Sequence, residues 1–196
     1  MVKYYQELTI LPDGEVNENH IWGKLYQSVH IALSDKMEER GRIGVSFPHY
    51  SLDGLGDKLR IFAETEEDLL ALNMQQQVAR YRDYVHVKGI AKIPKHVAWA
   101  TFRRRHNKGN PAKLARRYAK RHNVSFDEAI NLFSEQEHRK QEHRKQEHRK
   151  LPYVVLRSDS NGYEYRLSIE KIDKEEVVEM GFGSYGLDNQ STVPVF

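Results

Sequence analysis

RIGVSFPHYSLDGLGDKLRIFA, residues 42–63, is the stretch of this chain that decides its predicted fold. Two runs with the composition of β-strands, Arg42 to Phe47 and Lys58 to Ala63, flank a polar loop that contains glycine. Pro48 ends the first run because proline cannot donate a backbone hydrogen bond. The pattern predicts two strands, consecutive in the chain, that pair as a hairpin.

A strand and a helix are predicted before this hairpin. Tyr4 to Ile10 has the composition of a strand, and Asn17 or Asn19 can cap the helix that follows. Tyr26 and His30 lie four residues apart and therefore share one face of that helix. Its apolar residues recur at the same spacing, at Ile21, Leu25, Val29 and Leu33.

A second helix and a further strand are predicted after the hairpin. Thr65 followed by Asp68 predicts a capping box for a helix that runs to about Tyr84, and Val85 to Ile93 alternates like a strand. The resulting order is strand, helix, strand, strand, helix, strand. This order is typical of the ferredoxin-like fold, an antiparallel sheet with two helices on one face, and it predicts the α+β class. The same arrangement occurs in enzymes, regulators and binding modules, so the fold does not give the function.

The second half of the chain begins with a strand and a basic helix. His96 to Phe102 is a possible strand, and Pro111 fits the first turn of a helix at about 112–121. That helix carries basic side chains at three- and four-residue spacings, which places their charges on one broad face. A short helix from Phe126 to Phe133, capped by Ser125, follows and is expected to be structural.

Two more strands and a glycine-rich segment complete the chain. Tyr153 to Leu156 and Tyr163 to Ile169 flank a turn of Ser, Asp, Asn and Gly, which predicts another hairpin. The segment from Gly181 to Gly186 suits a tight loop near a ligand, and a terminal strand is expected up to Phe196. A phosphate loop of the Walker type is excluded because no Gly-Lys-Ser/Thr sequence occurs.

Residues 136–150 consist of the pentapeptide Gln-Glu-His-Arg-Lys repeated three times. A period of five fits neither a helix face nor strand alternation, and the segment has no apolar residue to anchor it. We interpret it as a low-complexity insert. Its histidines are disfavoured as metal ligands because helical ligand pairs lie three or four residues apart, and no metal or cofactor is expected.

Composition restricts the chemistry and favours a polyanionic partner. The sequence has no cysteine, which excludes disulfides, thiol catalysis and cysteine-ligated zinc and suits a reducing cytoplasm. It also has no apolar run long enough to span a membrane and no signal peptide, so a cytoplasmic protein is expected. The net charge is only +3, but the interval between Asp83 and Asp127 contains no carboxylate and many Lys and Arg residues. Such a one-signed segment indicates binding of a polyanion.

Several segments, in order and over nearly the whole chain, resemble one family. The chain is similar to the repeat-processing endoribonucleases of type I-F CRISPR systems. No single segment is decisive, but their joint order and spacing is specific. The segments are Arg42-Ile-Gly-Val-Ser-Phe-Pro48, Leu59-Arg-Ile61, Asn110-Pro111, Leu156-Arg-Ser-Asp-Ser-Asn-Gly162 and Gly181-Phe-Gly-Ser-Tyr-Gly-Leu187.

The resemblance implies a ferredoxin-like domain at 1–95 and, at 96–196, an RNA-binding α/β domain whose arginine-rich helix enters the groove of a repeat RNA hairpin. It also implies that the protein stays on the cleaved hairpin as a subunit of a larger effector complex. The basic residues of the helix that match are Lys113, Arg116, Arg117, Lys120 and Arg121.

The resemblance further assigns residues at the cut. Arg104 matches an arginine that reads a guanine edge, whereas its glutamine partner is His106 here. Tyr165 matches an aromatic residue that stacks on a nucleotide beside the cut. Ser158 matches the serine that orients the attacking hydroxyl, with Ser160 as a second polar contact. Tyr185 matches the active-site tyrosine.

The family mechanism uses the 2′-hydroxyl of the RNA as nucleophile and leaves a 2′,3′-cyclic phosphate and a 5′-hydroxyl. It requires a general base, and histidine suits this role near neutral pH. In better-known members that histidine follows Gly-Lys-Leu directly, but here Tyr26 follows Gly23-Lys-Leu25. His30, one turn later, is the favoured base. Tyr26 could assist it, contact the RNA or replace it, although a phenol is a poorer base.

Two other readings stay open. The chain could hold the RNA hairpin without cutting it, if catalysis has been lost with the displaced histidine. It could instead be an unrelated ferredoxin-like or ribosome-associated protein, in which the basic helix alone would be functional. The C-terminal Gly-Phe-x-x-Tyr-Gly segment argues against that second reading.

Overall fold

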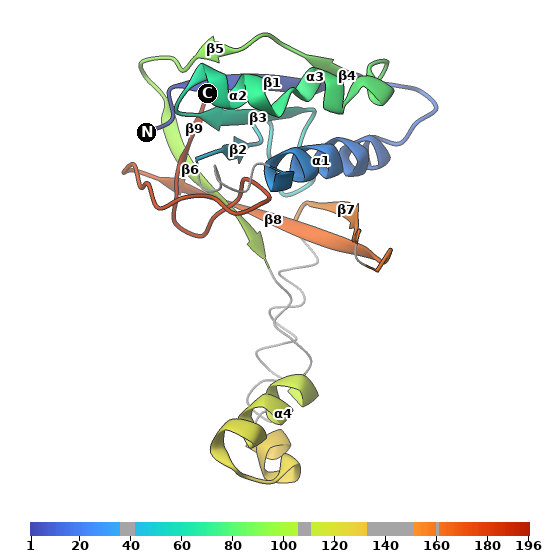
Figure 1. Ribbon diagram of the computed structural model, residues 1–196, viewed down its shortest axis with the longest axis vertical. Coiled ribbons are helices and arrows are strands. Elements are labelled where there is room, and N and C mark those ends of the chain that lie inside the picture. Colours follow the sequence, from blue (N-terminus) through green and yellow to red (C-terminus); the bar gives the residue numbers. More distant parts are fainter. Residues whose placement is uncertain (36–41, 106–110, 133–150, 160) are drawn as a thin grey trace. The chain divides into compact units, whose positions relative to one another are not determined.

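The computed structural model describes residues 1–35, 42–105, 111–132, 151–159 and 161–196. The chain forms two compact units, one made of residues 1–104 and 152–196 and the other of residues 105–151. Helices and two β-sheets are present (Figure 1), which is compatible with the predicted α+β class. In the described part of the chain, no helix combines the length and apolar character needed to cross a membrane.

The first sheet contains the predicted hairpin and has the order β2-β3-β1-β4, with β5 also paired to β1. Its pairings β2 with β3, β3 with β1, and β1 with β4 and β5 are all antiparallel. The bounds are β1 Tyr4–Ile10, β2 Gly44–Ser46, β3 Lys58–Ala63, β4 Val85–Val87 and β5 Ala91–Lys92. The predicted antiparallel sheet is therefore confirmed.

Helix α1, Glu18–Asp35, follows β1 as predicted. Asn17 caps it, because the Asn17 side chain accepts a hydrogen bond from the Asn19 N–H at 2.8 Å. The indole N–H of Trp22 donates to the Gly56 carbonyl at 2.8 Å, so that the helix is fixed to the loop before β3. The apolar stripe is buried in the core as expected, at Ile21, Leu25, Val29 and Leu33.

The predicted second helix is shorter than expected. Thr65 caps α2, Glu66–Leu72, by accepting a hydrogen bond from the Asp68 N–H at 3.2 Å, so the predicted start is confirmed. The expected continuation to Tyr84 is wrong, because Asn73 takes a left-handed conformation with φ 45° and ends the helix. A further turn, α3 (Met74–Gln77), and a 3-10 turn (Ala79–Tyr81) follow.

The strand predicted over Val85 to Ile93 is interrupted. Leu8 of β1 pairs with Val87, whereas Tyr4 of β1 pairs with Lys92, so the register shifts by one residue between β4 and β5. The extra residue falls at residues 88–90, where Gly89 permits a bulge in the strand. The prediction of one continuous strand is therefore wrong, although both halves pair with β1.

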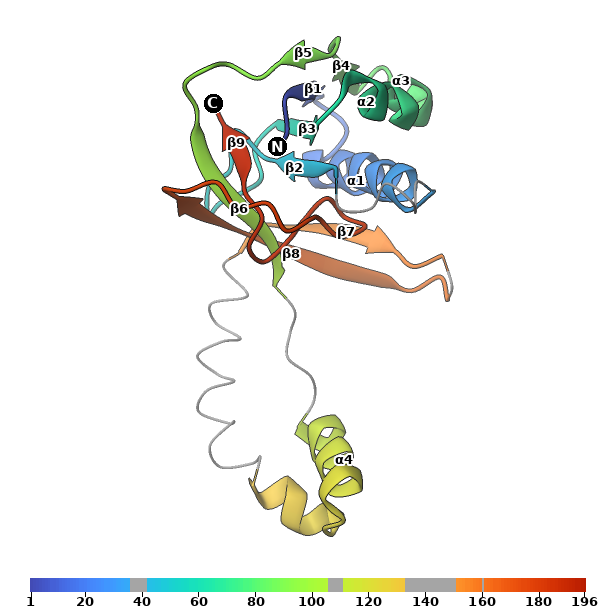
Figure 2. The ribbon, with the colours of Figure 1, turned by 60° about the vertical axis from the view of Figure 1, so that its left-hand side comes forward.

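The second sheet has the order β7-β8-β6-β9. Strand β6, Ala98–Arg105, begins two residues later and runs three residues further than predicted; it pairs antiparallel with β9, Val193–Val195. Strands β7, Tyr153–Arg157, and β8, Glu164–Lys174, form the predicted hairpin, which Figure 2 shows as a long ribbon. Both sheets contribute to one continuous core.

The unit of residues 105–151 contains α4, Pro111–His122, where the basic helix was predicted. A second helical segment covers residues 126–132, and the Ser125 hydroxyl accepts a hydrogen bond from the Glu128 N–H at its start. Ala115 and Ala129 are buried within this unit. The repeated pentapeptide at 136–150 lies outside the described residues.

Candidate active site

His30 is held by the loop between β8 and β9. Its Nδ1 lies 2.9 Å from the Ser184 carbonyl oxygen and 3.4 Å from the Ser34 hydroxyl. A carbonyl oxygen can only accept a hydrogen bond, so Nδ1 carries the proton in this contact. In the neutral ring Nε2 then holds the free lone pair. No partner for Nε2 occurs among the described residues, which leaves that nitrogen available to take a proton.

Tyr185 packs directly on the His30 ring. The two ring centroids are 4.0 Å apart and the planes are inclined by only 14°, which is a stacked arrangement. The ring contact and the hydrogen bond from Nδ1 restrain the imidazole in two directions. The predicted pair of His30 and Tyr185 is thus in contact.

Tyr26 lies one turn before His30 and fixes the same loop. Its hydroxyl donates to the Tyr185 carbonyl at 2.9 Å, and its side chain is fully buried. Burial raises the pKa of Tyr26 well above the usual value, and the nearby Tyr185 adds to this. A phenol with a raised pKa is a weaker source of phenolate at neutral pH. Contact between Tyr26 and any ligand would require the loop to move away.

The loop that carries Tyr185 depends on a glycine. Gly186 has φ 68°, in the left-handed region where side chains are strained. A Cβ there would lie 2.6 Å from Val45 Cγ1, and the Val45 N–H donates to the Gly186 carbonyl at 3.0 Å. The loop therefore sits directly against β2, the strand of the first sheet that the hairpin motif predicted.

Tyr165 and Arg104 extend the cluster across the second sheet. The Tyr165 and Tyr185 hydroxyls are 2.7 Å apart, and the Arg104 guanidinium lies 5.6 Å and 5.3 Å from the two ring centroids. Burial and the hydrogen bond with Tyr185 raise the pKa of Tyr165 to about 12, although the positive charge of Arg104 opposes this. Four of the predicted residues, His30, Tyr185, Tyr165 and Arg104, therefore form one connected group.

Ser158 lies in the turn between β7 and β8. Its N–H donates to the Tyr163 carbonyl at 2.9 Å, and its carbonyl accepts from the Gly162 N–H at 2.8 Å. The Arg157 side chain closes the turn by donating from Nε to the Gly162 carbonyl at 3.1 Å. These bonds join the two sides of the turn, at Arg157 and Ser158 and at Gly162 and Tyr163. Ser160 lies outside the described residues.

Helix α1 anchors the serine turn, through a residue that the sequence reasoning missed. The Gln27 side-chain oxygen accepts a hydrogen bond from the Arg157 N–H at 3.1 Å. At Gly23 the helix approaches β7 so closely that a Cβ would lie 2.7 Å from the Val155 carbonyl oxygen. One helix therefore orients both His30 and the turn of Ser158. The spacing of Gln27, three residues before His30, was the only available signal.

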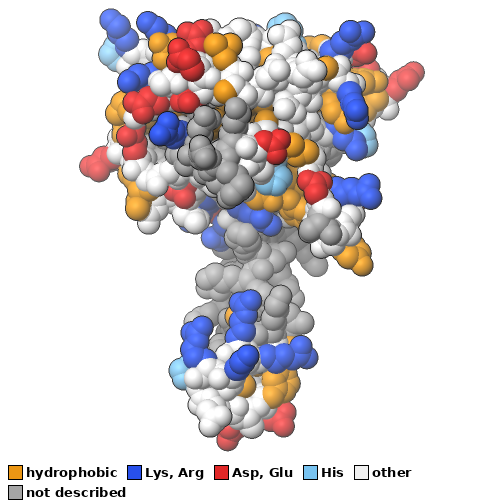
Figure 3. All heavy atoms as spheres, viewed as in Figure 1, with side chains coloured by type: hydrophobic (Ala, Val, Ile, Leu, Met, Phe, Trp, Pro, Cys, Tyr) orange, Lys and Arg blue, Asp and Glu red, His pale blue; other side chains and the backbone are white. Residues whose placement is uncertain are grey.

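The basic helix presents its charges to solvent. Figure 3 shows Lys and Arg side chains gathered on the unit that contains α4. The Arg116 guanidinium lies 5.8 Å from the Phe126 ring centroid, within the same unit. His106 and the side chain of Lys113 lie outside the described residues. The other predicted basic residues of the helix are exposed, namely Arg116, Arg117, Lys120 and Arg121.

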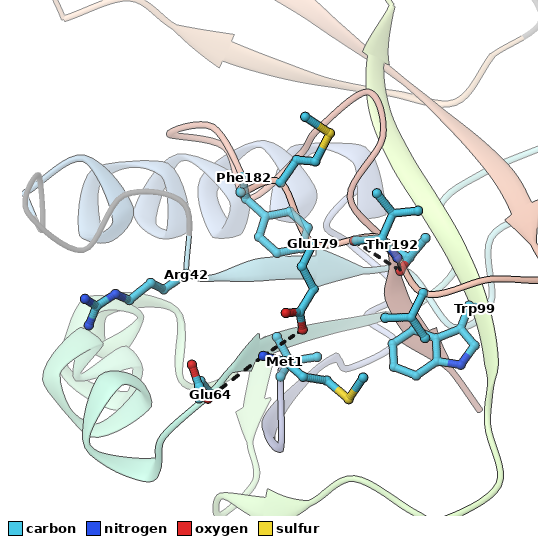
Figure 4. A pocket seen from close by; sticks show the side chains of 12 residues that line it. Met1, Arg42, Glu64, Trp99, Glu179, Phe182 and Thr192 are labelled. Carbon is cyan, nitrogen blue, oxygen red and sulfur yellow. Dashed lines mark hydrogen bonds and ion pairs between the residues drawn. The ribbon is translucent and has the colours of Figure 1, made fainter.

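A cavity of about 350 Å³ lies elsewhere in the larger unit. Trp99 and Phe182 form part of its wall, and Figure 4 shows the carboxylates of Glu179 and Glu64 directed at the amino group of Met1. None of the site residues predicted from the sequence lines this cavity. The candidate site is therefore the cluster around His30 rather than the cavity.

Together, the two sheets, the histidine-tyrosine cluster and the serine turn anchored to the same helix define an α+β protein with a candidate acid-base site. The family model described as "CRISPR-associated protein (Cas_Csy4)" matches residues 5–196, and the chain belongs to that family.

Two relatives are similar over their whole length. One is the CRISPR-associated endonuclease Cas6/Csy4 of Pseudomonas aeruginosa (strain UCBPP-PA14), 32% identical over 98% of this chain and 99% of that protein. The other is the protein of the same name from Escherichia coli (strain UTI89 / UPEC), 28% identical over 98% of this chain and 99% of its own length. Both are named as endonucleases.

Proposed function

We propose that this protein is an endoribonuclease that cuts CRISPR precursor RNA at its repeat hairpins. Family membership and the names of the two relatives support this activity. The orientation of His30 carries the proposal: Nδ1 donates to the Ser184 carbonyl, and Nε2 is left to accept a proton. Such an arrangement fits a general base.

The reaction we propose needs no metal ion. Nε2 of His30 takes the proton of a ribose 2′-hydroxyl, and the O2′ atom attacks the adjacent phosphorus. The bond from phosphorus to the O5′ of the next nucleotide breaks, O5′ takes a proton from water, and the imidazolium returns its proton to the hydroxide so formed. The products are a 2′,3′-cyclic phosphate and a 5′-hydroxyl. Ser158 orients the 2′-hydroxyl, and Tyr185 keeps the imidazole plane fixed by stacking.

We propose that each unit contributes residues that bind the RNA hairpin. Helix α4 enters the RNA groove, where exposed cations neutralise phosphates from two strands. Arg104 reads a base edge, His106 takes the role of the family glutamine, Tyr165 stacks on a nucleotide at the cut, and Ser160 adds a polar contact. Tyr26 supports the Tyr185 loop from inside the core rather than touching RNA, in keeping with its burial. The α4 contacts come from Lys113, Arg116, Arg117, Lys120 and Arg121.

We further propose that the first sheet and its helices form a ferredoxin-like domain over 1–95, followed by an RNA-binding domain over 96–196. The strand order and the antiparallel pairings of the first sheet are compatible with the ferredoxin-like fold. The protein is expected to act in the cytoplasm, to remain on the cleaved hairpin and to join other subunits of a type I-F effector complex.

Incubation of the purified chain with the cognate repeat RNA in EDTA tests the activity. The expected result is one cut at the base of the hairpin, with no cut in an RNA whose stem strands have been made non-complementary. A requirement for added Mg²⁺ would contradict the metal-independent mechanism, and equal cutting of the unpaired RNA would contradict hairpin recognition.

The alternative is a subunit that binds the RNA hairpin without cutting it. One observation favours it: the residue after Gly23-Lys-Leu25 is Tyr26, whose fully buried phenol cannot reach a substrate in this conformation. This reading predicts tight hairpin binding by the wild type and no cleavage under any condition.

A further inference from the structure

Tyr163 exposes its aromatic ring at the turn that carries Ser158. The side chain is 74% exposed, which is more than any other aromatic side chain in the described ranges. A buried aromatic ring stabilises the folded state, but the exposed ring of Tyr163 adds little to this stability. A single exposed ring is common on protein surfaces, so the neighbours of Tyr163 decide whether this one has a function.

The position of Tyr163 relates it to the proposed cut. Its carbonyl accepts the hydrogen bond from the Ser158 N–H, so the two residues lie opposite each other across the hairpin. Tyr165, the second residue of β8, lies two residues further along the chain, about 7 Å away if the backbone is extended. Tyr165 is bound to Tyr185 and lies near Arg104, whereas Tyr163 faces solvent. The open ring therefore belongs to the residue opposite Ser158, and the engaged ring to the residue opposite Leu156, further from the turn.

Hydrogen bonds hold the backbone of Gly162 and Tyr163. The Tyr163 N–H donates to the Asn161 side chain at 3.1 Å, and the preceding Gly162 is held by the Ser158 carbonyl and by the Arg157 side chain. Gly162 has φ 71°, which suits glycine at this point of the turn. A ring on a backbone held by such bonds loses little conformational freedom when it binds a planar ligand.

The groove beside the turn suits a phosphodiester. A cavity of about 170 Å³ between α1 and the β7–β8 hairpin is lined in part by Lys24, Gln27 and Arg157, with Glu164 as its one carboxylate. The Gln27 oxygen is taken by the Arg157 N–H, and among the described residues its amide nitrogen has no partner. Two cations and a free amide donor thus line a groove next to the hairpin whose turn presents the exposed ring.

We propose that Tyr163 stacks on the base of the nucleotide immediately 3′ of the cut, in the strand that is released. The inference rests on the proposed function, since Ser158 marks the reacting 2′-hydroxyl. In the proposed function Arg104 and Tyr165 contact the RNA hairpin, which leaves Tyr163, nearer the tip of the β7–β8 turn, for the nucleotide on the other side of the cut. Stacking there would hold the leaving oxygen in line with the attacking one, with little dependence on which base is present.

The test compares single-turnover cleavage by the wild type and Tyr163→Ala. Substrates carry either a normal base or an abasic ribose at the nucleotide 3′ of the cut. We expect Tyr163→Ala to cut the normal substrate about tenfold more slowly, to match the wild type on the abasic substrate, and to be rescued by Tyr163→Trp. Leu70→Ala on α2, an exposed side chain at 62%, is the matched control and should be neutral.

Binding measurements separate this inference from the proposed catalysis. Tyr163→Ala should bind the product hairpin, which lacks the 3′ nucleotide, as tightly as the wild type does. It should bind uncut RNA with a 2′-deoxyribose at the cut more weakly, even if the wild type proves unable to cleave. Equal slowing on the abasic substrate, or unchanged cleavage and binding with every RNA, would overturn the role of Tyr163.

Discussion

At the scale of single residues, the function of His30 depends on which ring nitrogen carries the proton. The Ser184 carbonyl requires a proton on Nδ1 and so leaves Nε2 as the base in the neutral ring. A histidine at the position of Tyr26 would lie on the same helix face, one turn earlier. His30 therefore lies on the side of α1 where the family histidine would stand, and it takes over the role of that histidine in the proposed mechanism.

We predict that His30→Ala slows cleavage by at least 100-fold and leaves hairpin affinity within about twofold, because loss of a general base typically costs 10²- to 10⁴-fold. Single-turnover cleavage and a filter-binding titration measure the two quantities. His86→Ala, an exposed histidine on β4, is the matched control.

Tyr26→Phe distinguishes the two candidate bases. It keeps the buried ring but removes the hydroxyl that donates to Tyr185, so cleavage should persist at a reduced rate. Complete loss in Tyr26→Phe together with full activity in His30→Ala would assign the base to Tyr26.

The sequence predicted part of this cluster and could not predict the rest. The spacing of Tyr26 and His30 was sufficient to place both on one helix face, and the structure brings both to the Tyr185 loop. It could not predict that Tyr26 is the buried member, because depth depends on the strand and loop packed above the helix. The Ser184 carbonyl has no side-chain signal at all, since any residue provides the same acceptor.

At the scale of elements, the loop that carries Tyr185 requires glycine at position 186. We predict that Gly186→Ala lowers the free energy of unfolding by about 1–3 kcal/mol and slows cleavage, because a side chain is strained at φ 68° and meets Val45. Thermal or urea unfolding measures the first effect. Gly14→Ala is the control, since nothing lies within 4 Å of a Cβ there. Equal stability of the two variants would contradict this account of the loop.

The proposed groove contact of α4 gives a second prediction at this scale. Arg117→Ala should weaken hairpin binding and lower the slope of log affinity against log salt by about one, because one phosphate contact is lost. Cleavage at saturating enzyme should be unchanged, since Arg117 takes no part in the chemistry. An unchanged salt slope would indicate that this side chain does not contact phosphate. Binding titrations at several salt concentrations measure it.

Local sequence signals predicted where elements begin better than where they end. Thr65 caps α2 as expected, but the helix stops at Asn73 because that residue adopts a left-handed conformation. Asparagine allows this conformation without requiring it, so the sequence alone did not distinguish a break from a continuous helix. The bulge between β4 and β5 escaped prediction for a similar reason: Gly89 permits it, but pairing with β1 determines the register.

At the scale of the whole molecule, a buried ion cluster ties the first sheet to the last residue of the sequence. Glu7 is only 3% exposed and accepts hydrogen bonds from Arg60 at 2.8 Å and Lys88 at 2.7 Å. The Arg60 guanidinium also lies 4.0 Å from the centroid of the Phe196 ring. Burial alone would raise the pKa of Glu7, but the hydrogen bonds from Lys88 and Arg60 outweigh it and hold the pKa below the usual value.

This cluster predicts a pH dependence of stability. Because the pKa of Glu7 is lowered by folding, its contribution is complete above the unfolded value near 4.3 and is lost as the pH falls through the folded value. Glu7→Gln should cost about 3 kcal/mol at pH 7, since it leaves buried Arg60 without its partner. The difference from the wild type should shrink in acid. Urea unfolding at pH 7 and pH 3 measures it, and a constant difference would contradict the prediction.

The sequence predicted only part of the arrangement of the two sheets. Strands β1 to β5 precede Pro94 and strands β6 to β9 follow it, which is where the sequence suggested a boundary. The sequence could not show that residues 1–104 and 152–196 pack into one unit, because that packing depends on contacts between distant segments. The proposed division into domains at residue 95 differs from the division into compact units, and it stays a prediction.

The central claim is metal-independent cleavage of RNA by its own 2′-hydroxyl, with His30 as base. The most direct measurement incubates the wild type in EDTA with two repeat RNAs that differ only by a 2′-deoxyribose at the cut, and identifies the ends formed. We predict a 2′,3′-cyclic phosphate and a 5′-hydroxyl from the normal RNA, and tight binding without cleavage of the deoxy RNA. Cleavage of the deoxy RNA, or a product with a 3′-hydroxyl and a 5′-phosphate, would contradict the mechanism.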